Sequence, residues 1–132
     1  MKEKMLKQMQ SVTEAQYMQE HARIKPILDA EAAIRGKLAQ LDRQVKEARE
    51  QSDSDHAMKS LGADLLWQGW HHRMRRQLNT ELAQATAKKL MAMDRLRKSF
   101  GRKHAVQTMS REATEQKKAD QRKRRDAQLM KF

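Results

Sequence analysis

The stretch IKPILDAEAAIRGKLAQLDRQVKEA, residues 24–48, places its apolar side chains at alternating steps of three and four. Such steps put residues on one face of an α-helix and mark the core positions of a coiled-coil heptad. Glu31 alone interrupts the series, and Tyr17 extends it one heptad backwards. The apolar positions are Ile24, Ile27, Ile34, Leu38, Leu41, Val45 and Ala48. The pattern predicts a long helix that buries a narrow stripe.

Pro26 lies inside this pattern, where it has no N–H to donate and its ring crowds the preceding turn. We therefore expect a kink or a short break near Arg23–Lys25. Because the apolar phase is the same on both sides of Pro26, the sequence favours a kink.

A second helical pattern follows a polar stretch at residues 51–60. Ser and Asp residues in this stretch favour a turn, Leu61-Gly62 comes next, and Ser54 or Asp55 could cap the second helix. The second stripe comprises Leu65, Trp67, Trp70, Met74, Leu78, Leu82, Ala85, Met93, Leu96 and Phe100, then Val106, Met109 and Ala113.

The composition suits helices and makes strands improbable. Helix-forming residues dominate, while the chain has one Pro, four Gly and only five aromatic residues. We predict an all-α fold, a long antiparallel two-helix coiled-coil hairpin that spans residues 1–132 as a single domain. The expected arms cover about residues 2–50 and 63–128, with a turn at about 51–62.

Charge is distributed unequally between the two arms. Residues 1–66 carry eleven Lys and Arg against eleven Asp and Glu, whereas residues 67–132 carry eighteen against six. The second arm therefore suits an acidic partner. Its far end, from about Ala113 to Phe132, should extend beyond the first arm and expose its cations. These are Lys117, Lys118, Arg122, Lys123, Arg124 and Arg125.

The chain lacks the residues that several kinds of chemistry need. The chain has no Cys, no glycine-rich phosphate loop and no nucleophile–base motif, so we expect no enzymatic activity and no cofactor. His71 and His72 are adjacent and would point about 100° apart on a helix, so we expect no metal site there. No secretory signal or long apolar run is present, which favours a cytoplasmic protein or one docked peripherally on a membrane.

Trp67 and Trp70 are the only tryptophans and lie three residues apart, just past the expected turn. They could close the core at the tip of the hairpin, as large aromatic residues often do. They could instead be an exposed anchor for another protein, because Trp is enriched at binding hot spots. The sequence leaves both roles open.

The layout resembles the FliJ-type stalk proteins of bacterial flagellar and type III export. The resemblance is carried by Trp67-Gln68-Gly69-Trp70, the long helix at 74–109, and Glu115-Gln116-Lys117-Lys118-Ala119-Asp120 followed by Arg122–Arg125. It implies a non-enzymatic rod whose basic end enters a hexameric export ATPase and whose Trp67 and Trp70 meet the membrane export gate. It also implies handling of export chaperones, no small-molecule substrate, and a cytoplasmic location at the inner-membrane export apparatus.

A second class of function uses the same charges. A basic helical protein could bind RNA or DNA non-specifically, for example at ribosomes. No helix-turn-helix, basic-zipper or RNA-binding signature is present, and past Trp70 only Phe100 interleaves an aromatic ring with the basic residues. Acidic protein surfaces attract the same side chains, so the nucleic-acid alternative stays open.

Overall fold

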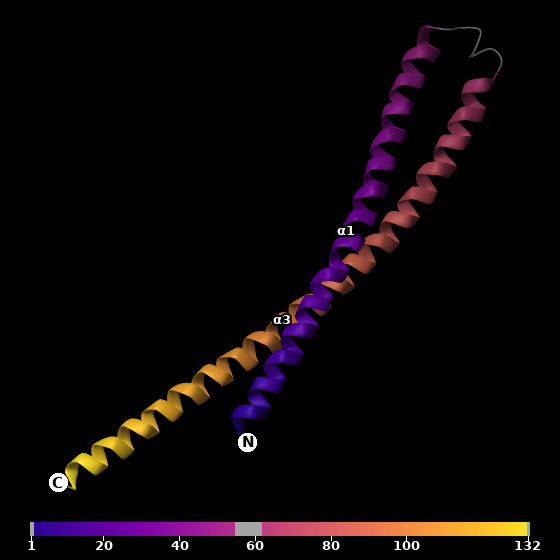
Figure 1. Cartoon of the computed structure of the whole chain (residues 1–132). Helices are drawn as coiled ribbons and strands as arrows, with labels where there is room; N and C mark the ends of the chain where they lie inside the picture. The colour runs from indigo at the N-terminus through magenta and orange to yellow at the C-terminus, as the bar shows by residue number, and fades with distance from the viewer. Residues whose placement is uncertain (1, 55–61, 132) are drawn as a thin grey trace. The chain divides into compact units, whose positions relative to one another are not determined.

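A computed structural model describes residues 2–54 and 62–131, in which two long α-helices pack against each other. Helix α1 spans Lys2–Ser54 and helix α3 spans Ala63–Met130 (Figure 1). No strand occurs in these described ranges. The predicted all-α, two-helix fold is confirmed.

The segment between the helices differs from the predicted turn. Residues 51–54 continue α1, so Ser54 ends the first helix and does not cap the second. Asp55 and the rest of the stretch to residue 61 lie outside the described residues. Gly62 precedes α3 with a φ of 72°, a left-handed conformation that glycine adopts without steric cost. The Gly62 carbonyl accepts a hydrogen bond from the Leu66 N–H at 3.4 Å.

Helix α1 is continuous through Pro26, so a short break is absent, and the kink that the sequence favours stays a prediction. Pro26 cannot donate to the carbonyl of Ala22, four residues earlier. Both residues are exposed, which lets water satisfy that carbonyl. The inward-facing positions keep their steps of three and four on both sides of Pro26, as the sequence predicted.

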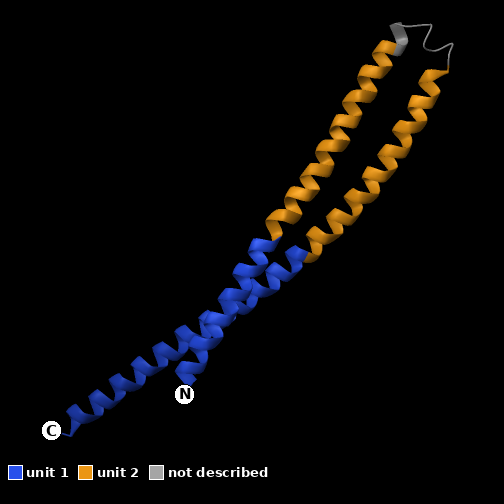
Figure 2. Cartoon of the chain, turned by 45° about the vertical axis from the view of Figure 1, so that its right-hand side comes forward, with its two compact units in different colours: residues 1–23, 92–132 blue, residues 24–91 orange. Residues whose placement is uncertain are grey.

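The chain forms two compact units, coloured separately in Figure 2. The first unit comprises residues 1–23 and 92–132, and the second comprises residues 24–91. In each unit a part of α1 lies beside a part of α3, and the two run in opposite directions. Ion pairs record this order: Glu20 with Arg95 and Glu3 with Lys117 in the first unit, Glu31 with Lys89 and Asp42 with Arg75 in the second.

The α1 stripe follows the predicted phase and extends it toward the N-terminus. Positions that are buried or half-buried recur at strictly alternating steps of four and three. They are Leu6, Gln10, Thr13, Tyr17, Glu20, Ile24, Ile27, Glu31, Ile34, Leu38, Leu41, Val45 and Ala48. We call this set the α1 seam. Four polar residues, Gln10, Thr13, Glu20 and Glu31, also lie in the seam because their helical spacing turns them toward the partner helix.

The α3 stripe departs from the prediction at several positions. Leu65, Trp70, Met93, Phe100 and Met109 were expected in it, but each is at least 40% exposed. The positions that turn inward, which we call the α3 seam, are Trp67, His71, Met74, Leu78, Leu82, Ala85, Lys89, Ala92, Leu96, Ser99, Lys103, Val106, Ser110 and Ala113. A seam between two helices is narrow, so a single phase is buried and a large side chain one position away stays outside.

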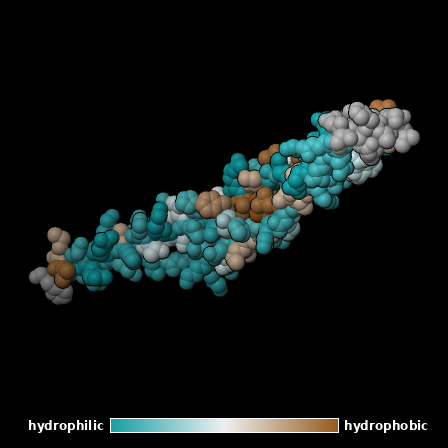
Figure 3. All heavy atoms as spheres, turned by 90° about the horizontal axis from the view of Figure 1, so that it is seen from above, coloured by the Kyte–Doolittle hydropathy of each residue, from teal (hydrophilic) through white to brown (hydrophobic). Residues whose placement is uncertain are grey.

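Small side chains make up much of the α3 seam in the first unit. Ala92 and Ser99 are 2% and 1% exposed, and the Ser99 hydroxyl donates to the Leu96 carbonyl at 2.8 Å. Tyr17 packs beside them, with its ring centroid 5.8 Å from that of Phe100 and 4.6 Å from the Lys103 ammonium. Hydrophilic residues dominate the face shown in Figure 3, and apolar residues gather there in small patches.

Candidate functional site

The basic end of α3 is a continuous helix that carries exposed cations. Every side chain from residue 121 to residue 131 is exposed, including Arg122, Lys123, Arg124 and Arg125. Lys118 is exposed as well. Within the first unit this part of α3 continues past the N-terminus of α1, at the yellow end of Figure 1. The predicted exposure of these cations is therefore confirmed, and their partner stays a prediction.

Lys117 departs from the prediction because α1 reaches it. Its ammonium lies 3.0 Å from the Glu3 carboxylate, so it does not lie beyond the first arm. The pairing lowers the pKa of Glu3, mainly through the hydrogen bond from Lys117 and then through its charge. Ala113 and Ala119 are half-buried, which also places this turn of α3 beside α1. The uncovered segment therefore begins about two turns later than the sequence indicated.

The two tryptophans have different surroundings. Trp67 is half-buried in the α3 seam and stacks on His71, with ring centroids 5.7 Å apart and planes 10° apart. Trp70 is 40% exposed and touches Trp67 at 6.4 Å between centroids. Trp67 thus contributes to packing between the helices, and Trp70 has surface left for a partner. Trp67 therefore has the packing role, and the role of Trp70 as an anchor for a partner stays a prediction.

Charged pairs occupy seam positions that heptad patterns usually reserve for apolar residues. Glu31 is 7% exposed and lies between Lys89, at 3.0 Å, and Arg35, at 3.1 Å. The hydrogen bond from Lys89 is the main cause that lowers the pKa of Glu31, and burial opposes it. The sequence showed Glu31 only as an interruption of the stripe. Its partner could not be inferred because the register between the helices was unknown.

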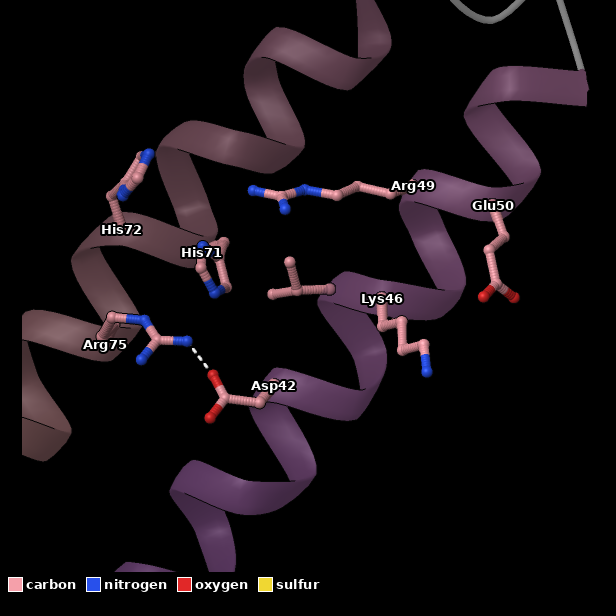
Figure 4. Close-up of a pocket in the computed structure, with 8 residues that line it drawn as sticks. Asp42, Lys46, Arg49, Glu50, His71, His72 and Arg75 are labelled. Carbon is pink, nitrogen blue, oxygen red and sulfur yellow. Dashed lines mark hydrogen bonds and ion pairs between the residues drawn. The ribbon is translucent and has the colours of Figure 1, made fainter.

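A groove opens between α1 and α3 in the second unit, with a volume of about 530 Å³. Its lining comprises Asp42, Val45, Lys46, Arg49, Glu50, His71, His72 and Arg75. Figure 4 shows His71 and Arg49 extending into the space between the helices from opposite sides, and the ion pair between Arg75 and Asp42 below them. The sequence singled out the two histidines only as improbable metal ligands, and it did not indicate that His71 faces Arg49.

His71 is the buried titratable group of this groove. It is 7% exposed, and its Nε2 atom has no hydrogen-bond partner among the described residues. Burial lowers the pKa of His71, and the positive charges of His72 and Arg49 add to the effect. No group of three or more His, Asp or Glu side chains in the described ranges could hold a metal ion. No helix there is long and apolar enough to cross a membrane.

No protein-family model matches the chain, and neither the curated proteins nor the solved structures contain a match. The function must therefore be inferred from the side chains and their geometry.

Proposed function

We propose that the protein is a non-enzymatic coiled-coil stalk of the flagellar export apparatus, which couples a hexameric export ATPase to the membrane export gate. The observation that carries this proposal is the basic end of α3. It is one helix, uncovered by α1 from residue 121 onward, with four consecutive cations at residues 122–125. A single helix of this kind is narrow enough to enter a ring.

The basic end calls for an acidic partner. The first unit carries seventeen Lys and Arg against eight Asp and Glu, so acids of the chain itself do not neutralise it. Cations of this density steer a complementary acidic surface and align it. We place the ATPase ring at Lys118 and Arg122–Arg125, with Lys117 held by Glu3 at its margin.

The second unit offers a different contact. Trp70 keeps 40% of its surface exposed beside the half-buried Trp67, an arrangement suited to an aromatic anchor in a partner's pocket. We assign the export gate to Trp70, supported by Trp67. Handling of export chaperones, and a cytoplasmic position on the inner-membrane export apparatus, belong to the same proposal.

The proposal is tested by the ATPase activity of the purified ring with this protein added after nuclease treatment. One variant changes Lys118, Arg122, Lys123, Arg124 and Arg125 to Gln. A matched control changes five exposed cations elsewhere on α3, namely Lys88, Arg97, Lys98, Arg102 and Arg111. We expect the parent and the control to stimulate the ring and the end variant to lose stimulation. Equal effects of all three proteins, or none, would contradict the stalk.

Nucleic-acid binding is the second candidate, and the exposed cations along α3 favour it. Arg97, Lys98 and Arg102 are exposed well before the basic end, so positive charge is not confined to the end that would enter a ring. Phosphate binding would use both groups of cations, and its affinity would fall steeply with salt through counterion release. Tight binding of an arbitrary RNA duplex at physiological salt, weakened alike by both five-residue variants, would favour this alternative.

A further inference from the structure

The groove between α1 and α3 in the second unit contains a positive group that has no counter-ion among the described residues. Asp42, the nearest acid in Figure 4, is paired with Arg75. Arg49 forms no ion pair with any described residue, and its guanidinium extends toward His71 (Figure 4). The Glu50 carboxylate lies on the side of α1 that faces away from the histidines in that view. An anion would complete the charge balance.

His71 adds a buried ring nitrogen that has no hydrogen-bond partner among the described residues. Its side chain is more than nine-tenths buried, points toward α1, and leaves Nε2 without a hydrogen bond in the described part of the chain. A buried polar atom without a partner is costly, and a ligand that accepts from it removes this cost. Trp67 stacks on the imidazole ring of His71 and so limits its rotation.

We propose that this groove binds a phosphate group, which accepts hydrogen bonds from the Arg49 guanidinium and from the His71 and His72 imidazoles. Arginine suits this role because its planar fork of donors matches phosphate oxygens. Donors that converge from two helices suit a tetrahedral anion with several acceptor oxygens. The groove, at about 530 Å³, can also hold a phosphate that is part of a larger molecule, such as a nucleotide. This site is independent of the stalk function.

The affinity of the site should depend on pH through His71. The charged and titratable groups that line the groove with it are Asp42, Lys46, Arg49 and Glu50 from α1, and His72 and Arg75 from α3. In the free protein, burial and the adjacent positive charges keep the pKa of His71 below 6.5. A bound dianion favours the charged imidazole and raises that pKa, so binding takes up a proton. Binding should therefore tighten as the pH falls below about 6.5.

The test uses the full chain with Trp70→Phe, so that Trp67 is the only tryptophan and its fluorescence reports on the groove. Inorganic phosphate and ADP are titrated separately at constant ionic strength, with sodium chloride as the reference salt. Sulfate serves for the pH series because its charge does not change between about pH 5 and 8. Imidazole resonances of His71 and His72, followed by NMR, provide a second measurement.

We expect a saturable response to phosphate and to sulfate that sodium chloride does not reproduce. Arg49→Gln should weaken binding about tenfold or more, because a charge-assisted hydrogen bond is lost. Arg43→Gln is the matched control, since Arg43 is an exposed cation of α1 outside the groove and should leave affinity unchanged. His71→Gln should remove the pH dependence of sulfate binding, with the helix content checked by circular dichroism.

The two sources of phosphate are separated by comparing the titrations. Tighter binding of ADP than of inorganic phosphate would assign the groove to a nucleotide, and equal or weaker binding would assign it to the free ion. Either result supports the site if Arg49→Gln weakens the binding of the ligand. The site is refuted if no ligand gives a saturable change by fluorescence or NMR, or if Arg49→Gln and Arg43→Gln weaken binding equally.

Discussion

Two residues at seam positions, Glu31 and His71, carry polar atoms where a coiled coil ordinarily places aliphatic side chains. Glu31 forms ion pairs with two cations, one on each helix. His71 has a stacking partner but no hydrogen-bond acceptor for Nε2 among the described residues. These two surroundings have opposite consequences: the charged form of Glu31 is favoured in the fold, and the charged form of His71 is disfavoured.

His71 should make the protein less stable in mild acid. Its folded-state pKa lies below the ordinary value of 6.5, so the unfolded chain binds the proton more readily. The stabilising effect is complete above pH 6.5 and is lost as the pH falls from 6.5 through the folded-state pKa. We expect the melting temperature of His71→Leu to change less with pH in this window than that of the parent. At low pH it should be higher than that of the parent. His104→Leu, at an exposed position of the first unit, is the control and should keep the slope of the parent. Parallel curves for the parent and His71→Leu would contradict this assignment.

The two helices differ in how regularly their inward positions repeat. The α1 seam alternates steps of four and three from Leu6 to Ala48 without exception. The α3 seam contains one additional step of four between Met74 and Leu82, so that Lys89 lies eleven positions after Leu78. Such an insertion locally unwinds a left-handed supercoil. It also brings Lys89 into the seam, where it meets Glu31.

The pair of Glu31 and Lys89 should set the register of the helices more than their stability. Lys89→Leu alone leaves a buried carboxylate with one partner fewer, and we expect the melting temperature to fall by about 5 °C or more. Changing both residues to Leu should restore or exceed the melting temperature of the parent, because an apolar pair avoids the desolvation of two charges.

The double Leu variant should pair its helices less specifically than the parent. We expect additional oligomers by sedimentation, since a buried polar pair disfavours alternative registers. Glu81→Leu with Lys88→Leu is a matched control that changes charges outside this pair. A double variant that remains as unstable as Lys89→Leu would show that the pair contributes to stability itself.

At the scale of the whole molecule, one chain supplies both helices of each unit. The ion pairs in both units have the antiparallel order that a hairpin requires, since the partner's residue number falls as the α1 number rises. The chain also has no Cys, so introduced pairs can be cross-linked without background. The net charge is also unevenly distributed over the molecule, because most of the +12 lies on α3.

Cross-linking should occur within one molecule. We expect a short bifunctional maleimide to join Asp42→Cys to Arg75→Cys, and Glu3→Cys to Lys117→Cys, because each parent pair forms an ion pair. Asp42→Cys with Lys89→Cys is the control in the second unit, since Lys89 lies about 21 Å along α3 from Arg75 and should not react. Products that run as dimers on a denaturing gel would replace the hairpin with an intermolecular pairing.

The sequence by itself determined the helices, because steps of three and four and the scarcity of Gly and Pro are local properties of a chain. It also located the α1 seam around Ile24–Ala48 and the exposed cations at Arg122–Arg125. Only the tertiary structure decided which phase of α3 is buried, and so that Ser99 is inside while Phe100 is half-exposed. It also decided that Lys117 reaches Glu3, that Glu31 meets Lys89, and that Arg49 faces His71. Each of these contacts depends on the register between two helices, and register is set by side chains far apart in the sequence that meet only after folding.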